Sequence, residues 1–134
     1  MLISTKGRYA LSVMIDLAEH ESEGFIPLSD ISERLDISKK YLEAIIRALS
    51  KEKIVKGIRG KGGGYKLNVS PDKCTAWDVI KATEDNFTSV SCVSDDHMKC
   101  PNKALCKTMP MWLALDRDLK AFFDKYTIAD FLEN

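Results

Sequence analysis

The sequence predicts a mainly α-helical fold with one small β-hairpin. Three observations support this prediction: apolar residues recur at helical spacing along most of the chain, two β-prone runs flank a cluster of glycines, and 134 residues suffice for about one domain. With 45% hydrophobic and 30% charged residues, the composition is that of a folded globular protein and excludes extensive disorder. Folding alone would bury only about two-thirds of the unfolded surface, so association into a dimer would add stability.

The first predicted helix runs from about Lys6 to His20, and Thr5 precedes it as a candidate cap. Its apolar residues recur on one side at helical spacing, which predicts a helix that packs in the core. These apolar residues are Tyr9, Val13, Met14, Leu17 and Ala18.

Two shorter helices are predicted next. Pro27 introduces the first, which buries Ile31 and Leu35 and ends at residues 36–37. Ser38 caps the second, whose apolar side follows the i, i+3, i+4, i+7 pattern and whose opposite side is basic. The apolar side consists of Leu42, Ile45, Ile46 and Leu49, and the opposite side of Lys40, Ala44, Arg47 and Lys51 with Glu43 at its flank. Two short helices in this arrangement predict a helix-turn-helix.

A β-hairpin is predicted directly after these helices. The β-prone runs 54–59 and 65–69 flank a glycine-rich tip at residues 60–64, and the hairpin carries several basic residues. A basic hairpin in this position is a wing, so we expect residues 1–70 to form a winged helix-turn-helix. The glycines could instead form the phosphate-binding loop of an enzyme, but the G-x-x-x-x-G-K-[ST] spacing is absent.

The charge distribution supports a surface that binds nucleic acid. The chain has no net charge, yet residues 38–66 carry nine basic and two acidic side chains, whereas residues 1–37 carry three and seven. Lysines and the amides of the glycine tip would contact phosphates. Base edges would be reached by Tyr41, Glu43 and Arg47, and Arg59 would enter a minor groove. The predicted DNA-binding residues are Lys39, Lys40, Tyr41, Glu43, Arg47, Lys56, Arg59, Gly60, Lys61, Gly62, Gly63, Gly64 and Tyr65.

Glu43 is the only acidic residue in that set. A carboxylate near phosphates is repelled unless it accepts a hydrogen bond, most naturally from the amino group of a cytosine. It could instead pair with Arg47 one turn along the helix and contribute nothing to specificity.

Residues 71–134 are predicted to complete one compact domain with a helix, a cysteine loop and a long helix. Thr75 and Asp78 resemble a capping box, and Ala76, Val79 and Ile80 would face inward. Residues 84–107 show no periodicity and are expected to form a loop. From Pro110 to Tyr126 the chain is strongly helical, and its apolar stripe suits dimerisation. That stripe comprises Trp112, Leu115, Leu119, Phe122 and Tyr126.

Three of the four cysteines lie close together, as Cys92, Cys100 and Cys106 with the spacing C-x7-C-x5-C. This clustering suggests a metal or redox site, and three thiolates suit an iron–sulfur cluster, zinc or copper(I). Cys74 lies outside the group, just before a helix, and is expected to be structural.

The chain resembles the Rrf2 family of bacterial winged-helix regulators. The resemblance is carried by Tyr41-Leu42-Glu43, the wing sequence of residues 59–67, Trp112 and the final segment 127–132, and it covers essentially the whole chain. Within the family the chain looks most like the IscR branch of iron–sulfur regulators, and next like the nitric-oxide sensor branch NsrR and the cysteine-metabolism branch CymR. The resemblance implies a homodimer, with crossed long helices, on a pseudo-palindromic operator in double-stranded DNA.

The resemblance also implies that Cys92, Cys100 and Cys106 hold an iron–sulfur cluster, [2Fe-2S] rather than [4Fe-4S]. Two features depart from the family pattern. The first cysteine spacing is two residues longer than usual, and Met109 and Arg8 occupy the positions where family members place a histidine or an acidic ligand. The fourth ligand is therefore open. The candidates are His97, Met109, Asp95, Asp96 and a residue of the other protomer.

Functions other than that of a cluster-sensing regulator are also compatible with these residues. They are a cluster-free thiol switch or cysteine-responsive regulator, a zinc protein, an electron-transfer or cluster-carrier protein, and a protein-interaction module. An enzyme is disfavoured because His20 and His97 are the only histidines and neither has a nearby nucleophile. The absence of a long apolar run and of a secretory signal predicts a cytoplasmic protein with no membrane partner.

Overall fold

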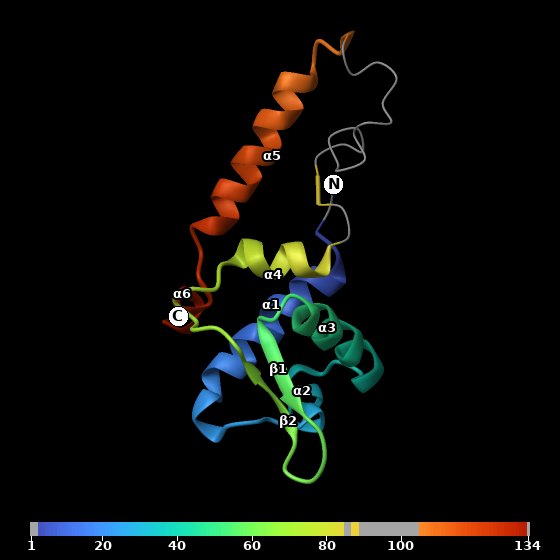
Figure 1. Cartoon of the computed structure of the whole chain (residues 1–134), viewed down its shortest axis with the longest axis vertical. Coiled ribbons are helices and arrows are strands. Elements are labelled where there is room, and N and C mark those ends of the chain that lie inside the picture. Colours follow the sequence, from blue (N-terminus) through green and yellow to red (C-terminus); the bar gives the residue numbers. More distant parts are fainter. Residues whose placement is uncertain (1–2, 85–86, 89–104, 134) are drawn as a thin grey trace.

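The computed structural model describes residues 3–84, 87–88 and 105–133. In chain order the elements are α1 (Thr5–Glu19), the 3-10 helix η1 (Glu21–Glu23), α2 (Leu28–Leu35), α3 (Lys39–Lys51), β1 (Val55–Ile58), β2 (Gly64–Leu67), α4 (Ala76–Thr83), α5 (Met109–Asp124) and α6 (Ile128–Leu132) (Figure 1). The described part of the chain is mostly helical with a two-stranded antiparallel hairpin, which confirms the predicted fold class.

Helix α1 lies at the centre of the core. Ala10, Val13, Met14 and Leu17 are fully buried, as the helical spacing predicts. Two details of the prediction were wrong. Tyr9 lies at the border of the apolar side and is 39% exposed, and Ser4 rather than Thr5 caps the helix, because its Oγ accepts from Gly7 N at 3.0 Å.

Helices α2 and α3 form the predicted helix-turn-helix. Asp36 ends α2 in a left-handed conformation, with φ 53°, and Ser38 then caps α3 by accepting from Tyr41 N at 3.2 Å. The four apolar residues predicted for the rear of α3 are all buried. Leu35 is only partly buried, although it packs against the core as expected.

The hairpin pairs Val55 with Leu67 and Ile58 with Gly64. Its strands cover residues 55–58 and 64–67, so Gly64 belongs to β2 and not to the tip. A Cβ at Gly64 would lie 2.3 Å from the carbonyl oxygen of Ile26, and the backbone φ is 157°. The glycine is therefore required because the chain before α2 passes close to β2.

The C-terminal segment returns to the body beside the start of α4. Thr75 and Asp78 form the predicted capping box. Ala76 N donates to Tyr126 O at 2.8 Å, and Ile128 N donates to Cys74 O at 2.9 Å. These bonds dock α6, whose Ile128 is fully buried in the same core as α1.

Helix α5 projects away from the body, on the side of the molecule opposite the hairpin tip (Figure 1). It begins at Met109, with Pro110 in its first turn, and ends two residues before the predicted limit. None of its residues is buried, although its apolar stripe includes Trp112, Leu115 and Leu119. Within the described ranges, no helix is long and apolar enough to cross a membrane.

A partly buried ion pair joins α1 to α2. Asp16 is only 4% exposed, and its two carboxylate oxygens accept from Arg34 Nε at 2.8 Å and Nη2 at 2.9 Å. Hydrogen bonding to Asp16 raises the pKa of Arg34 above its ordinary value, so the guanidinium stays charged. Because the bonds are parallel and bidentate, they also fix the relative orientation of the two helices.

This pair predicts the effect of removing the guanidinium. Arg34→Met would leave the Asp16 carboxylate buried without its bidentate partner, and we expect the free energy of unfolding to fall by about 3 kcal/mol. Urea denaturation followed by circular dichroism measures the change. Arg34→Lys keeps the charge but not the paired geometry, so its free energy of unfolding should lie between those of the wild type and Arg34→Met. An unchanged value for Arg34→Met would show that the pair contributes no net stability.

Candidate nucleic-acid interface

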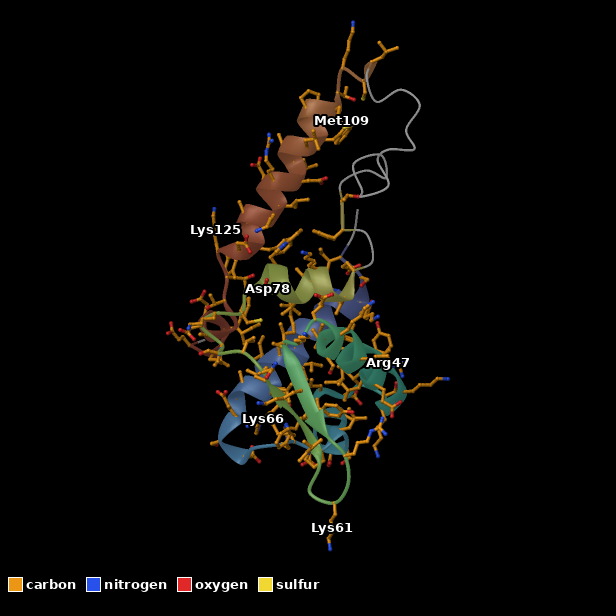
Figure 2. All side chains as sticks on the ribbon, in the orientation of Figure 1. Arg47, Lys61, Lys66, Asp78, Met109 and Lys125 are labelled. Carbon is orange, nitrogen blue, oxygen red and sulfur yellow. The ribbon has the colours of Figure 1, made fainter. Side chains whose placement is uncertain are left out.

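The outer side of α3 is basic. Lys39, Lys40, Glu43 and Arg47 are exposed, and the small Ala44 lies partly buried among them. Figure 2 shows Arg47 pointing away from the body of the protein. Because the opposite side of the helix is buried in the core, these side chains can only face outward.

The hairpin adds a second basic element. Lys56, Arg59 and Lys61 are exposed, and Lys61 extends from the very tip (Figure 2). Gly60 and Gly62 are exposed in the tip with φ of 96° and 79°, a conformation that favours glycine. The tip is thus a turn whose backbone is accessible from solvent.

Gly64 and Tyr65 do not share that accessibility. Gly64 is buried beside Ile26, and the backbone of Tyr65 pairs with Ile26 in both directions, with N···O distances of 2.8 and 2.9 Å. These contacts with the chain before α2, which local sequence does not reveal, occupy the backbone of Tyr65 and cover Gly64. That the two residues bind DNA stays a prediction.

Tyr41 connects the outer side of α3 to α1. Its ring is partly buried and meets the ring of Tyr9 edge to face, with centroids 5.9 Å apart and planes at 82°. The helical spacing of Tyr9 predicts a position in the core, whereas its ring lies beside the basic surface. The available signal was its place at the edge of the apolar stripe, where a ring with a polar hydroxyl is often half exposed.

The basic side chains of this surface have no counter-ion within the described part of the chain. Among the described residues, no carboxylate lies within 4.0 Å of the charged groups of Lys39, Lys40 or Arg47. In particular, the pair between Glu43 and Arg47 that helical spacing allows is not formed. The positive charge of the surface is therefore available to an external anion, and Glu43 is available to an external donor.

Of the three clustered cysteines, only Cys106 lies within the described residues, just before α5. Its Sγ lies 3.5 Å from Thr108 Oγ1, and hydrogen bonds from the side chain and backbone of Thr108 lower the pKa of the thiol. Trp112 Nε1 donates to the same hydroxyl oxygen at 3.2 Å, which leaves the hydroxyl hydrogen free to point at the sulfur. This environment favours the thiolate, the form that binds metal.

Of the other predicted ligands in this chain, Met109 alone lies within the described residues. Cys92 and Cys100 lie outside the described residues, as do the candidate fourth ligands His97, Asp95 and Asp96. Met109 is partly buried as the first residue of α5. In the part of the chain that the structure describes, no group of three or more histidine, cysteine or acidic side chains could hold a metal ion.

Cys74 behaves differently from Cys106. It is 1% exposed, and burial, reinforced by the nearby Asp78, raises the pKa of its thiol to about 12. The thiol is therefore protonated at neutral pH and inaccessible, in agreement with the structural role predicted for it.

An apolar cavity of about 360 Å³ lies between α4 and α5. Trp77, Phe87, Leu113 and Leu119 supply apolar walls, and Lys120 lies over the Trp77 ring at 5.8 Å. The stripe of α5 therefore rests only partly on its own chain.

Comparison with known proteins agrees with this architecture. Residues 3–134 match the family model described as "Rrf2: Iron-dependent Transcriptional regulator". An HTH-type transcriptional regulator IscR from Aliivibrio salmonicida is 36% identical over 132 residues, which cover 98% of this chain and 77% of that protein.

Two solved structures have the same fold. The structure of T. potens IscR matches with a TM-score of 0.76 and 32% identity, covering 99% of this chain and 87% of the other. The structure of CymR, the global cysteine regulator of B. subtilis, matches with a TM-score of 0.76 and 34% identity, covering 99% and 97%. These relatives are regulators and not enzymes. Since the match runs along nearly the whole chain, the protein belongs to the Rrf2 family of transcriptional regulators.

Proposed function

We propose that this regulator binds a specific double-stranded DNA sequence through α3 and the wing. The observation that carries the proposal is the row of exposed basic side chains on two adjacent elements, which have no counter-ion among the residues that the structure describes. The buried rear of α3 holds that row in one orientation, as a helix that enters a major groove requires.

Phosphate contacts position the protein on the duplex. Lys39 and Lys40 at the start of α3 and Lys56 and Lys61 in the hairpin supply the positive charge. The accessible amides of Gly60 and Gly62 add uncharged donors, whereas the Gly63 amide already donates to Gly60 O at 3.0 Å. Tyr65 N donates to Ile26 O and Gly64 is buried against the same residue, so these donors come from the tip itself.

Base contacts provide the sequence preference. Tyr41, Glu43 and Arg47 lie along the first turns of α3 and have donors or acceptors that base edges can meet. Arg59, next to the tip, suits a narrow minor groove, where the negative potential is concentrated.

The protein acts as a homodimer in this proposal, with each winged helix on one half of a pseudo-palindromic operator. Helix α5 supports this, because it carries a long apolar stripe and yet none of its residues is buried in the single chain. Water is a poor environment for such a stripe, and a second copy of α5 would cover it.

We further propose that Cys92, Cys100 and Cys106 hold an iron–sulfur cluster, [2Fe-2S] in preference to [4Fe-4S]. The donor set fits, since thiolates are the usual cluster ligands and the surroundings of Cys106 favour the thiolate. A bound cluster would supply a redox-sensitive and dissociable group between α4 and α5. In this proposal the protein supplies the three thiols, of which Cys106 lies just before the dimer helix, so a change in their state can alter the spacing of the two DNA-binding surfaces.

A cluster-free, cysteine-responsive regulator is the second candidate. It is favoured by the similarity to CymR, which matches this chain as closely in fold as IscR does. Met109 favours it as well, because the family's histidine ligand would stand at that position. An electron-transfer or carrier protein is disfavoured, because it would have no use for the basic surface.

Glu43 predicts a change in specificity. Glu43→Ala should keep or raise the affinity for unrelated duplexes, because a repulsive charge is lost, while the preference for the cognate sequence shrinks at one cytosine. Binding selection on randomised half-sites measures the preference. Lys40→Ala is the matched control on the same helix: it should weaken binding to all duplexes and lower the salt slope by about one unit. An unchanged preference profile for Glu43→Ala would contradict the role proposed for this carboxylate.

The proposed dimer predicts that a charge on the stripe separates the subunits. Leu119→Glu would bury a carboxylate between the two helices at a cost of several kcal/mol, so sedimentation should show monomers and full operators should be bound weakly. Ala121→Glu adds the same charge on the opposite, exposed side of α5 and should leave the dimer intact. If Leu119→Glu still sediments as a dimer, the interface lies elsewhere.

The cluster predicts a difference among the cysteines. After anaerobic purification, the wild-type protein should be coloured and contain iron and sulfide. Changing Cys92, Cys100 or Cys106 to serine should remove the colour, because a hard hydroxyl replaces a soft thiolate. Cys74→Ser should keep it, and Cys74 should resist alkylation at neutral pH because its pKa is about 12. Colourless wild-type protein with reactive thiols would favour the cluster-free regulator instead.

A further inference from the structure

A carboxylate from the end of α4 holds the N-terminus of α1. Glu84 Oε1 accepts from Ser4 N at 2.9 Å and from Ser4 Oγ at 2.6 Å, in a partly buried contact between residues 80 positions apart. Ser4 Oγ in turn accepts from Gly7 N at 3.0 Å. The residue that caps α1 is thus itself held by Glu84, whose negative charge also suits the positive end of the helix dipole.

The absence of a side chain at Gly7 leaves room for this carboxylate. A Cβ on Gly7 would lie 2.6 Å from Glu84 Oε1, closer than real Cβ contacts allow. Gly7 is not among the glycines with positive φ, so its backbone does not require glycine. Glycine is also unfavourable inside a helix relative to alanine. A side chain at this position would therefore displace the end of the flexible Glu84 side chain and would also crowd Ile3 Cγ2 at 3.3 Å.

The same short segment of α1 also supports the DNA surface. Tyr9 follows Gly7 by two residues and meets the ring of Tyr41 edge to face in the first turn of α3. The first turns of α1 therefore contact both Glu84 and α3. A displacement of this segment would change the contact between the rings of Tyr9 and Tyr41.

We propose that Glu84 is a positioning residue for the DNA surface: by holding the first turn of α1, it keeps Tyr9 against Tyr41 and so fixes the N-terminal turn of α3. The inference rests on the proposed function, because it assumes that α3 binds DNA. Glu84 is also the residue that ends α4, and the chain runs from it toward Cys92. The contact thereby links the start of the cysteine segment to the DNA surface.

Binding measurements with three variants of the full chain test this. The probe is a duplex that the wild-type protein selects from a randomised pool. Glu84→Ala removes both hydrogen bonds and should weaken binding by about fivefold or more, without changing the salt slope because no phosphate contact is lost. Glu84→Gln keeps an oxygen that accepts from Ser4 and should bind like the wild type. Lys81→Ala, an exposed change on the same helix, is the matched control.

Hydrogen exchange shows whether Glu84→Ala weakens DNA binding by loosening the first turns of α1 and α3. In Glu84→Ala the amides of residues 5–9 and 39–42 should exchange faster, while those of the buried second half of α3 should not change. A purely structural contact would lower the melting temperature but leave the affinity unaltered for protein that is folded at the assay temperature. If Glu84→Ala is not folded there, Gly7→Ala replaces it, since the added methyl group displaces the carboxylate without removing it.

A double-mutant cycle isolates the contact between positions 7 and 84. Gly7→Ala alone should lower the melting temperature, because its Cβ displaces the carboxylate from Ser4. In the Glu84→Ala background the same change should cost less, since only the contact with Ile3 Cγ2 at 3.3 Å remains and alanine favours the helix. Independent effects at the two positions would show that the carboxylate does not occupy the space beside Gly7, and would overturn the inference.

The outcomes separate this inference from the function on which it rests. A wild-type protein that selects no duplex refutes both. A wild-type protein that selects one, together with Glu84→Ala that binds it equally well, refutes the inference alone. Equal weakening by Glu84→Ala and Glu84→Gln also overturns it, because the hydrogen bonds to Ser4 would then not be what holds α1 in place.

Discussion

The burial of one side of α1 is the constraint on which the rest of the structure depends. Ala10, Val13, Met14 and Leu17 are completely removed from water, and burying a large apolar side chain stabilises the fold by about 1.5–3 kcal/mol. Helices α2, α3, α4 and α6 and strand β2 all pack on this helix. Polar contacts then fix how each neighbour is oriented: Asp16 holds α2 through Arg34, and Ser4 holds the end of α4 through Glu84.

This arrangement explains how a chain without net charge presents a strongly basic surface. The rear of α3 packs on α1, so Lys40 and Arg47 must face solvent. One acidic residue of the first third, Asp16, is buried and is neutralised internally by Arg34. The exposed lysines and arginines of α3 and the hairpin thus produce a local field that can attract a polyanion.

The part of the chain that departs from this packing is α5. It is anchored at its C-terminal end, where Tyr126 and Ile128 bond to the start of α4, and it extends away from the core at the other end (Figure 1). Cys106 and Thr108 lie at that other end, beside the N-terminus of the helix. Cys106 therefore lies at the end of α5 that is farthest from its anchor, where the proposed chemistry would act on the helix.

The helices, caps and wing that could be predicted from the sequence are those that depend on interactions between residues close together in the chain. Helical spacing identified the buried rear of α3, and local hydrogen bonding made Ser38 and Thr75 recognisable as caps, because a cap and its partner lie three residues apart. The position of the wing followed from two β-prone runs around glycines. The basic character of the candidate surface could be predicted in the same way, since exposure of one helix side follows from burial of the other.

The contacts between residues far apart in the chain could not be predicted from local sequence and are seen in the tertiary structure alone. Nothing near Ser4 or Glu84 in the sequence indicates that they meet, and nothing near Gly64 reveals that Ile26 lies against it. Tyr9 was assigned to the core because its spacing is that of the apolar side, yet its ring lies at the border against Tyr41. Periodicity states which side of a helix is apolar, whereas the width of the covered area depends on which neighbours pack there. That choice is made by the whole chain at once, through contacts that no local pattern encodes.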